Sequence, residues 1–386
     1  MGLEAEIACV PVRGVANGRP YLRVRFPFKP SHSKGKGDFL TAMTDPIGLG
    51  VEIGGTKLQL GLGRGDGTLI AIERARVKLA DGAQGILADI QAAFHRLRAQ
   101  AGIGLEQIEG AGIGFGGPVD TVRGRVVKSH QVAGWEDFAL GDWVRSNLGI
   151  ARVAVQNDAD TAGLGEARFG AGIGYSPLLY VTIGSGIGGG LILDGQIYRG
   201  AGAGALEIGH LWVVGRTTSD LGVVKLEDLA SGWAIASAAR RQADAIRRRP
   251  GSGSGSGWSV LDLAGGDPAR IQTEMVATAA RQGDQEALLL LQRATMAMSH
   301  ALVQTITLVA PERIILGGGV SEIDSSLWLD PIRQQVDRLV FPPFRGSFEI
   351  VPARLGEEVV VHGALALAHD LANIPKTEPP RSHFEP

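Results

Sequence analysis

Residues 51–67 read VEIGGTKLQLGLGRGDG, and this stretch is the most informative feature of the chain. A strand rich in β-branched residues enters the turn Gly54-Gly55-Thr56, and a second strand begins at once with Lys57. Only glycine lets backbone N–H groups approach an anion this closely, so the hairpin predicts a phosphate-binding turn. A Gly-Gly turn is also ordinary hairpin chemistry, so the stretch alone leaves both interpretations open.

Three further strand ends in the chain also open into glycines. Residues 182–190 read TIGSGIGGG, residues 311–319 read PERIILGGG, and residues 110–118 read GAGIGFGGP. Four such turns predict a nucleotide held in a cleft between two sheets. No Gly-Lys-Ser/Thr follows the glycines and no GxGxxG opens a helix, so the P-loop and dinucleotide-binding patterns do not apply.

With these motifs the chain resembles the ROK family of sugar kinases, in particular its glucokinase branch. The matching segments run from about 47 to 373 in the family's order: VEIGGTK, GFGGPVD, QNDADTAGLGEARFGAG, TIGSGIGGGLILDGQIYRGAGAGALEIGH, LEDLASG and APERIILGGGVS. The resemblance implies an α/β fold of two actin-like, ribonuclease-H-like ATPase domains with a cleft between them. It also implies transfer of the γ-phosphoryl group of ATP to a hexose, with glucose 6-phosphate as the expected product.

The composition is that of a globular protein and carries no nucleic-acid or membrane signature. The 386 residues are 44% hydrophobic and 20% charged, which suits two domains of ordinary size. The net charge of −2 offers no basic surplus for nucleic acid, and no apolar run is long enough to span a bilayer. Cys9 is the only cysteine, so a disulfide within the chain is impossible and the cytoplasm is the expected compartment.

We expect four parts along the chain. Residues 1–46 contain several prolines and no persistent period, which predicts a disordered extension or an unused upstream start before Met43. A regulatory or targeting role is the alternative. The N-terminal actin-like domain is expected at 47–158 and the C-terminal one at 159–373, whose last helix, by resemblance, packs on the first domain. Residues 374–386 are expected to form a loose, proline-rich tail.

Hydrophobic periodicity predicts a mixed sheet with crossover helices, followed by a second set of strands and helices. Strands are expected at 47–54, 57–63, 69–77, 109–115, 152–155, 178–184, 188–194, 313–316 and 348–352. Helices are expected at 82–100, 138–148, 159–169, 227–249, 271–282, 284–309 and 360–372, with a flexible tether at 251–257.

Asp158 is the expected catalytic base. It follows an apolar strand at 153–155, where a carboxylate can project into a cleft and accept the proton of a substrate hydroxyl. The residue also matches the family's base. The alternative is that Asn157 or Asp158 is only the N-cap of helix 159–169. The two roles are compatible if Asn157 caps the helix while Asp158 faces the substrate.

The resemblance also implies the residues that bind hexose. Glu207 and His210 are three apart in ALEIGH, so both can face one side of a helical turn. A buried core histidine at His210 and a first-turn glutamate at Glu227, complementing the helix dipole, are the alternatives. The implied hexose ligands are Gly117, Asn157, Asp158, Glu207, His210 and Glu227.

Three of the glycine turns are expected to bind ATP by resemblance. Lys57 could instead point to solvent, and residues 317–319 could be a plain strand-to-helix turn. The implied phosphate ligands are Gly54, Gly55, Thr56 and Lys57 in the first turn and Gly184, Ser185 and Gly186 in the second. The implied adenosine ligands are Gly317, Gly318 and Gly319.

Two departures from the family bear on metal and substrate. Glu52 stands where the family usually has aspartate, and we expect it to help hold Mg²⁺ through the phosphates. His130-Gln131 stands where the family often has Pro-Asn, so the usual asparagine contact to sugar is in doubt. Fructose, mannose, allose or an N-acetylhexosamine therefore remain alternatives to glucose.

A third departure is the loop at 211–227, LWVVGRTTSDLGVVKLE, where many ROK proteins bind zinc. Thr218, Asp220 and Lys225 occupy the cysteine positions, and a lysine ammonium cannot ligate zinc. We therefore expect no structural zinc. The loop is expected to hold Glu227 by packing instead, through Leu221, Val223 and Val224.

Two other classes of function compete with a kinase. A ROK repressor needs a helix-turn-helix module, which the 46-residue extension is too short and too proline-broken to supply. A sugar- or nucleotide-binding protein with weak catalysis is suggested by Glu52 and the His130-Gln131 change. A homodimer is implied only by analogy with the family.

Overall fold

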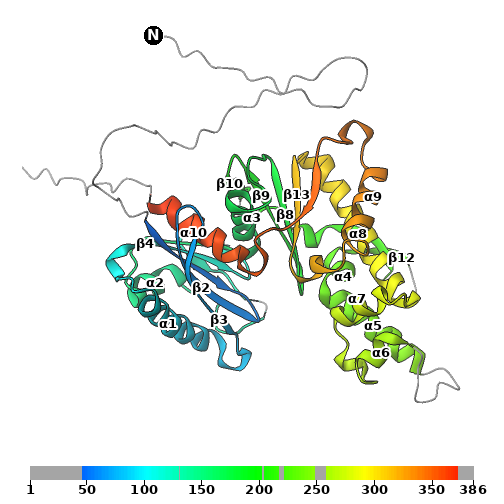
Figure 1. Cartoon of the computed structure of the whole chain (residues 1–386), viewed down its shortest axis with the longest axis horizontal. Coiled ribbons are helices and arrows are strands. Elements are labelled where there is room, and N and C mark those ends of the chain that lie inside the picture. The colour runs from blue at the N-terminus through cyan, green and yellow to red at the C-terminus, as the bar shows by residue number, and fades with distance from the viewer. Residues whose placement is uncertain (1–45, 130, 202–203, 217–220, 248–257, 373–386) are drawn as a thin grey trace, which may run out of the picture. The chain divides into compact units, whose positions relative to one another are not determined.

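The computed structural model describes residues 46–129, 131–201, 204–216, 221–247 and 258–372, which form an α/β protein (Figure 1). Contacts divide the chain into Met1–Thr44 and Asp45–Pro386, and the second unit contains every element described below. The expected extension up to residue 45, the tether at 251–257 and the tail at 374–386 lie outside the described residues.

Most of the expected strands and helices are present, with boundaries that shift by at most two residues. The main strands are β1 (Ile47–Ile53), β2 (Lys57–Arg64), β3 (Leu69–Arg76), β4 (Ile108–Phe115), β7 (Val153–Asn157), β8 (Leu178–Ile183), β9 (Ile187–Leu193), β13 (Arg313–Gly317) and β14 (Glu349–Pro352). The main helices are α1 (Gly82–Ala101), α2 (Leu140–Leu148), α3 (Asp158–Phe169), α4 (Glu227–Ala230), α5 (Gly232–Arg247), α7 (Thr273–Arg281), α8 (Gln285–Val309), α9 (Leu329–Leu339) and α10 (Val359–Ala372).

The first sheet has the strand order β3-β2-β1-β4-β7. Strand β1 pairs antiparallel with β2 and parallel with β4, which is the mixed sheet that the sequence predicted. Large residues alternate with glycines along β1, and Leu49, Val51 and Ile53 pack in one core with helix α1. The strand therefore has a bulky face toward α1 and a bare face on the other side.

Helix α10 lies on the bare face of the first sheet (Figure 1). A Cβ built on Gly50 would lie 2.6 Å from the carbonyl oxygen of Val361, and one built on Gly112 would lie 1.9 Å from that of Ala364. No other residue type fits at these positions, because the helix backbone already occupies the space of a side chain.

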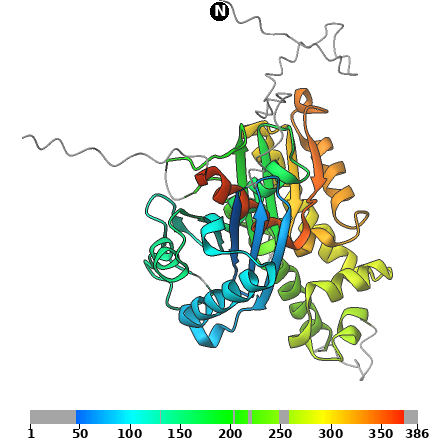
Figure 2. The ribbon, with the colours of Figure 1, turned by 60° about the vertical axis from the view of Figure 1, so that its left-hand side comes forward.

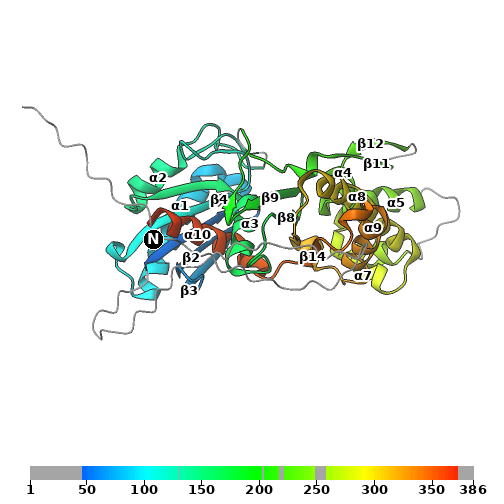
Figure 3. The same ribbon diagram turned by 90° about the horizontal axis from the view of Figure 1, so that it is seen from above.

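The second sheet has the strand order β10-β9-β8-β13-β14, where β10 is Gln196–Ile197. Leu179, Val181 and Ile183 of β8 pack in one core with the helices of 227–339, which Figure 2 shows on one side of this sheet. Helix α3 covers the other face and contacts α10, so these two helices lie between the sheets (Figure 3).

Several segments differ from the sequence-based expectation, among them the short helix α6 (Ser259–Leu263), which was not predicted. Helix α9 was not predicted, although Leu329, Ile332 and Val336 bury one face of it. The expected loop at 211–227 contains the hairpin of β11 (Trp212–Arg216) and β12 (Leu221–Lys225). The expected helix 227–249 is interrupted at Ser231, which separates α4 from α5.

Among the described residues, no helix combines the length and apolar character needed to cross a membrane.

Candidate active site

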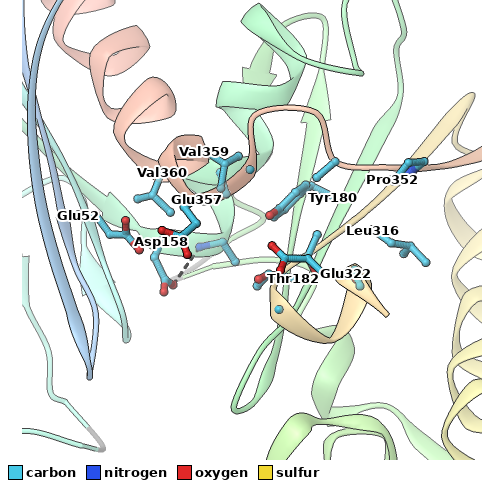
Figure 4. A pocket seen from close by; sticks show the side chains of 18 of the residues that line it. Glu52, Asp158, Tyr180, Thr182, Leu316, Glu322, Pro352, Glu357, Val359 and Val360 are labelled. Carbon is cyan, nitrogen blue, oxygen red and sulfur yellow. Dashed lines mark hydrogen bonds between the residues drawn. The ribbon is translucent and has the colours of Figure 1, made fainter. Parts of the chain in front are cut away.

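A cavity of about 430 Å³ lies where the carboxyl ends of strands from both sheets meet the start of α10 (Figure 4). Glu52, Lys57 and Asp158 line it from the side of the first sheet. Its other walls include Tyr180, Thr182, Leu316, Gly317, Gly318, Gly319, Ser321, Glu322, Pro352, Ala353, Gly356, Glu357, Val359 and Val360.

Asp158 is held at the cavity by the N-terminus of α3. Asn157 is the N-cap, and its Oδ1 accepts hydrogen bonds from the backbone N–H of Ala159 at 2.9 Å and of Asp160 at 3.2 Å. Its amide nitrogen donates to the carbonyl oxygen of Gly117 at 3.3 Å. Asn157 therefore caps the helix while the neighbouring Asp158 lines the cavity, so the cap does not exclude the predicted role of Asp158 as base.

The carboxyl of Asp158 is partly buried and has a raised affinity for protons. Burial raises its pKa to about 6, and the negative charge of Glu207 acts in the same direction. The backbone N–H of Ala159 donates to Oδ1 at 2.9 Å and opposes the shift. At neutral pH this group is mostly ionised yet a stronger base than an exposed aspartate, which suits it to accept a proton.

Glu52 is a buried carboxylate at the end of β1, with a fractional exposure of 8%. Burial raises its pKa to about 7 against the opposing charge of Lys57, and the charges of Asp158 and Glu357 raise it further. Its Oε2 lies 3.4 Å from Nζ of Lys57 and accepts no hydrogen bond from another described residue. A carboxylate oxygen of this kind beside a cavity is the type of ligand that Mg²⁺ prefers.

Lys57 spans the first sheet and the segment that leads into α10. Its Nζ donates a hydrogen bond to the carbonyl oxygen of Glu357 at 2.9 Å in addition to the ion pair with Glu52. Lys57 therefore does not extend freely into solvent. Lys57 is the residue of the first turn that lines the cavity.

The remainder of the first turn lies next to Asp158 without lining the cavity. A Cβ built on Gly116 would lie 3.4 Å from Oδ2 of Asp158 and 3.5 Å from Cα of Gly54, so Gly116 separates the turn from Asp158. A Cβ on Gly55 would overlap Oε1 of Gln131 at 1.3 Å. Gln131 therefore packs on the Gly-Gly turn; His130 lies outside the described residues, and Thr56 is exposed.

The second turn lies close to the proposed hexose ligands. A Cβ on Gly186 would lie 3.6 Å from Oε2 of Glu227, and Nε2 of His210 is 3.9 Å from Oε1 of Glu227. His210 is exposed, so the alternative of a buried core histidine is wrong. Glu227 is the first residue of α4, which satisfies the helix-dipole alternative without excluding a ligand role.

Gly184 and Ser185 support the start of α5 through their carbonyl oxygens. Gly184 accepts from the N–H of Gly232 at 2.8 Å, and Ser185 accepts from that of Trp233 at 3.4 Å. Neither residue lines the described cavity. The second turn thus contacts the helical layer through its backbone.

The three glycines at 317–319 differ in what they require. A Cβ on Gly317 would lie 2.4 Å from the hydroxyl of Tyr180. Gly318 has φ +83° and would place a Cβ 2.6 Å from the carbonyl oxygen of Ile183. Gly319 has no atom within 4 Å of a Cβ, so only here does the loop leave space beside its backbone.

The loop expected to hold Glu227 by packing does so with different residues. Val223 is 62% exposed, so that part of the expectation is wrong, whereas Val213 and Leu226 are buried in the core. Thr218 and Asp220 lie outside the described residues, and no side-chain contact is described for Leu221. Within the described ranges, no group of three or more His, Cys, Asp or Glu side chains could hold a metal ion.

Sequence reasoning missed several cavity residues because the fold brings them from distant parts of the chain. Glu357 belongs to the short turn η7 (Gly356–Glu358), which matches no motif. Tyr180 and Thr182 could have been found, because they alternate with the core residues of β8 and must face its other side.

Asp160 was not singled out either, although it is 3% exposed and its Oδ1 has no hydrogen-bond partner among the described residues. Burial raises its pKa to about 7, and Glu207 and Asp158 add like charge while Arg199 opposes them. The N-terminal turn of α3 thus carries two carboxyls with raised pKa values.

Comparison with known proteins agrees with this geometry. Residues 48–371 match the ROK family. A glucokinase of Thermotoga maritima is 31% identical over 83% of this chain and 96% of its own length.

Solved structures give the same result. A ROK family glucokinase from Streptomyces griseus, solved in complex with glucose and AMPPNP, is 32% identical with a TM-score of 0.70, covering 84% of this chain and 99% of that one. A ROK hexokinase from Thermus thermophilus is 26% identical with a TM-score of 0.66, covering 84% and 98%. The expected pair of actin-like ATPase folds is confirmed, and the chain belongs to the ROK family.

Proposed function

We propose that this chain is an ATP-dependent glucokinase, which transfers the γ-phosphoryl group of ATP to the 6-hydroxyl of glucose. The observation that carries the proposal is the position of Asp158. Its carboxyl lines the cavity with the glycines at 317–319, and its neighbour Asn157 contacts Gly117. A base between a nucleotide-sized cavity and a set of hydroxyl-binding side chains suits phosphoryl transfer to an alcohol.

The relatives support glucose as the acceptor. The Thermotoga maritima relative is a glucokinase, and the Streptomyces griseus glucokinase binds glucose and AMPPNP. Glu227 and His210 approach each other beside Gly186, and Glu207 is near enough to Asp158 to raise its pKa. These three side chains, with Asn157, supply the acceptors and donors that fixed sugar hydroxyls require.

In the proposed reaction, Asp158 accepts the proton of the hexose hydroxyl as its oxygen attacks the γ-phosphorus. The bond between that phosphorus and the β,γ-bridging oxygen breaks, and ADP leaves with the electron pair. The backbone N–H groups of the glycine turns and Nζ of Lys57 face the phosphate charge. Expulsion of water from the cavity limits hydrolysis of ATP in place of transfer.

Mg²⁺ is the metal we propose for this site. Glu52 would hold it together with the phosphate oxygens, because its buried Oε2 has no other hydrogen-bond partner among the described residues. When bound, the ion neutralises phosphate charge that would otherwise face Glu52, Asp158 and Glu357.

Two further properties are part of the proposal. We place the enzyme in the cytoplasm, supported by a single cysteine in 386 residues. We also propose a homodimer, by analogy with the family. Sedimentation of the purified full chain would test the second property.

A coupled assay of ADP release with Mg²⁺-ATP and a panel of hexoses tests the function. We expect turnover with glucose and little with fructose, mannose, allose or N-acetylhexosamines. Turnover with another hexose and none with glucose would show that this hexose is the substrate. Binding of glucose and ATP by calorimetry without turnover on any sugar would contradict a kinase.

A further inference from the structure

Glu322 is the side chain of the adenosine-side loop that remains available to a ligand. The loop continues from the glycines into η5 (Gly319–Glu322). Val320 is buried, and the hydroxyl of Ser321 donates to the carbonyl oxygen of Gly317 at 2.8 Å. Glu322 is exposed, lines the cavity and makes no hydrogen bond or ion pair with another described residue. The loop is thus fixed by its own contacts, and the carboxylate of Glu322 stays available to a ligand.

The position of the proposed base indicates which end of a nucleotide Glu322 meets. Asp158, Glu52 and Lys57 lie at one end of the cavity, whereas Glu322 lies on the other side, beside Thr182 and Tyr180 (Figure 4). Transfer of the γ-phosphoryl group requires the γ-phosphate to lie beside Asp158, where Lys57 and the proposed Mg²⁺ would offset the charge of the carboxylates. The nucleoside therefore belongs at the Glu322 end.

The chemistry of a carboxylate narrows the contact further. An ionised carboxylate only accepts hydrogen bonds, and its two oxygens suit two neighbouring donors. The ribose of ATP presents its 2′- and 3′-hydroxyls side by side. Leu316, Pro352 and Ala353 line the same region and offer an apolar surface for the base. Gly319 leaves open space beside the loop for the sugar to approach.

We propose that Glu322 binds the 2′,3′-diol of the nucleotide and so makes the enzyme select ribonucleotides over 2′-deoxyribonucleotides. This inference rests on the proposed function, because it assumes that the cavity holds ATP. It assigns Glu322 to nucleotide specificity and leaves Asp158 and the hexose ligands unaffected.

The test compares kcat/KM for ATP and 2′-deoxy-ATP in the wild type, Glu322→Gln and Glu322→Ala. A hydrogen bond to a charged group is worth about tenfold or more in binding, so we expect the wild type to prefer ATP by about tenfold. In Glu322→Ala we expect the ATP value to fall by about a hundredfold, because both hydroxyl contacts are lost, and the 2′-deoxy-ATP value to fall by about tenfold, because only the 3′-hydroxyl contact is lost, so the preference disappears. Asp324→Asn, which removes one negative charge two residues away where Asp324 pairs with Arg281, should keep the preference.

Two outcomes would overturn the proposal. If Glu322→Ala lowers kcat/KM for ATP and 2′-deoxy-ATP by the same factor, Glu322 affects the pocket in general and does not bind the 2′-hydroxyl. A lost preference for ATP over inosine triphosphate, with the 2′-deoxy preference intact, would assign the carboxylate to the base amine. Calorimetric titration of the same variants with the same nucleotides measures the preference without turnover, so failure here is distinguishable from failure of the kinase proposal.

Discussion

Buried carboxyls are the distinctive residues of this site. Glu52, Asp158 and Asp160 have pKa values raised to about 7, 6 and 7, and burial is the main cause in each case. Each therefore binds a proton more tightly in the folded chain than in the unfolded chain. Each carboxyl contributes to the free energy of unfolding while it is protonated. This contribution is lost as the pH rises toward and through the pKa of the group in the folded chain.

Asp160→Asn should stabilise the protein at pH 8. The variant keeps the shape of the side chain but removes a charge that burial and Glu207 disfavour, so we expect the free energy of unfolding to rise by about 2 kcal/mol. The gain should shrink between pH 7 and pH 4, where wild-type Asp160 becomes protonated in the folded state. Thermal and urea unfolding at pH 5 and pH 8 measure both effects.

Asp194→Asn is the matched control for this prediction. Asp194 is exposed, and its Oδ1 accepts from the hydroxyl of Ser176 at 3.2 Å. Its φ of +50° is one that asparagine tolerates well. The variant Asp194→Asn should leave the pH dependence of stability unchanged. A destabilised Asp160→Asn at pH 8 would show that the ionised form has a partner in the folded protein.

At this scale the sequence predicted the residues that belong to motifs. Asn157 and Asp158 could be found because a polar pair follows an apolar strand. Glu357 could not, because it reaches Lys57 across 300 positions of the chain. The contact of Gln131 with Gly55 likewise depends on a tertiary approach that neither local pattern encodes.

At the scale of elements, the decisive feature is the bare face of the first sheet. Glycines alternate with large residues along β1, and α10 rests on them. The period-2 pattern of the sequence defines both the bulky face and the bare face, which explains why β1, β2 and β4 were predictable. Helix α9 was overlooked although its apolar spacing was present, because a proline at 331 in its first turn resembles a breaker.

Gly112→Ala tests this packing. The added methyl would fall 1.9 Å from the carbonyl oxygen of Ala364, so α10 or the sheet must move, and we expect a loss of about 3 kcal/mol. Gly222→Ala is the control, because no atom lies within 4 Å of its Cβ. Urea unfolding followed by tryptophan fluorescence compares the two. Equal stability of both variants would show that α10 does not rest on the sheet as described.

At the scale of the whole molecule, the last helix ties both sheets into one site. Helix α10 contacts α3, β1 and β4, and Arg168 of α3 pairs with Asp370 at 3.1 Å. Every residue that lines the cavity lies between Glu52 and Val360, inside the range that matches the ROK family. The two-domain boundaries expected at 158 and 159 remain a proposal, since α3 starts there and packs on elements of both sheets.

A chain that starts at Met43 should therefore keep full activity. It retains β1, which begins at Ile47, and all residues proposed for the site. We expect unchanged kcat/KM for glucose and ATP and an unchanged unfolding midpoint, measured beside the full chain. A shortened chain that unfolds normally but loses activity would give residues 1–42 a role in the reaction.

The proposed function depends on Asp158, which accepts the proton of a glucose hydroxyl during phosphoryl transfer. The most direct test is ADP release with Mg²⁺-ATP and glucose for the wild type and Asp158→Asn, with glucose affinity measured by calorimetry. We predict a fall in kcat of roughly 10²–10⁴ with glucose affinity within about tenfold, because an amide still hydrogen-bonds a hydroxyl. The wild-type kcat/KM should decline below about pH 6 as Asp158 becomes protonated. Full turnover in Asp158→Asn would contradict the account.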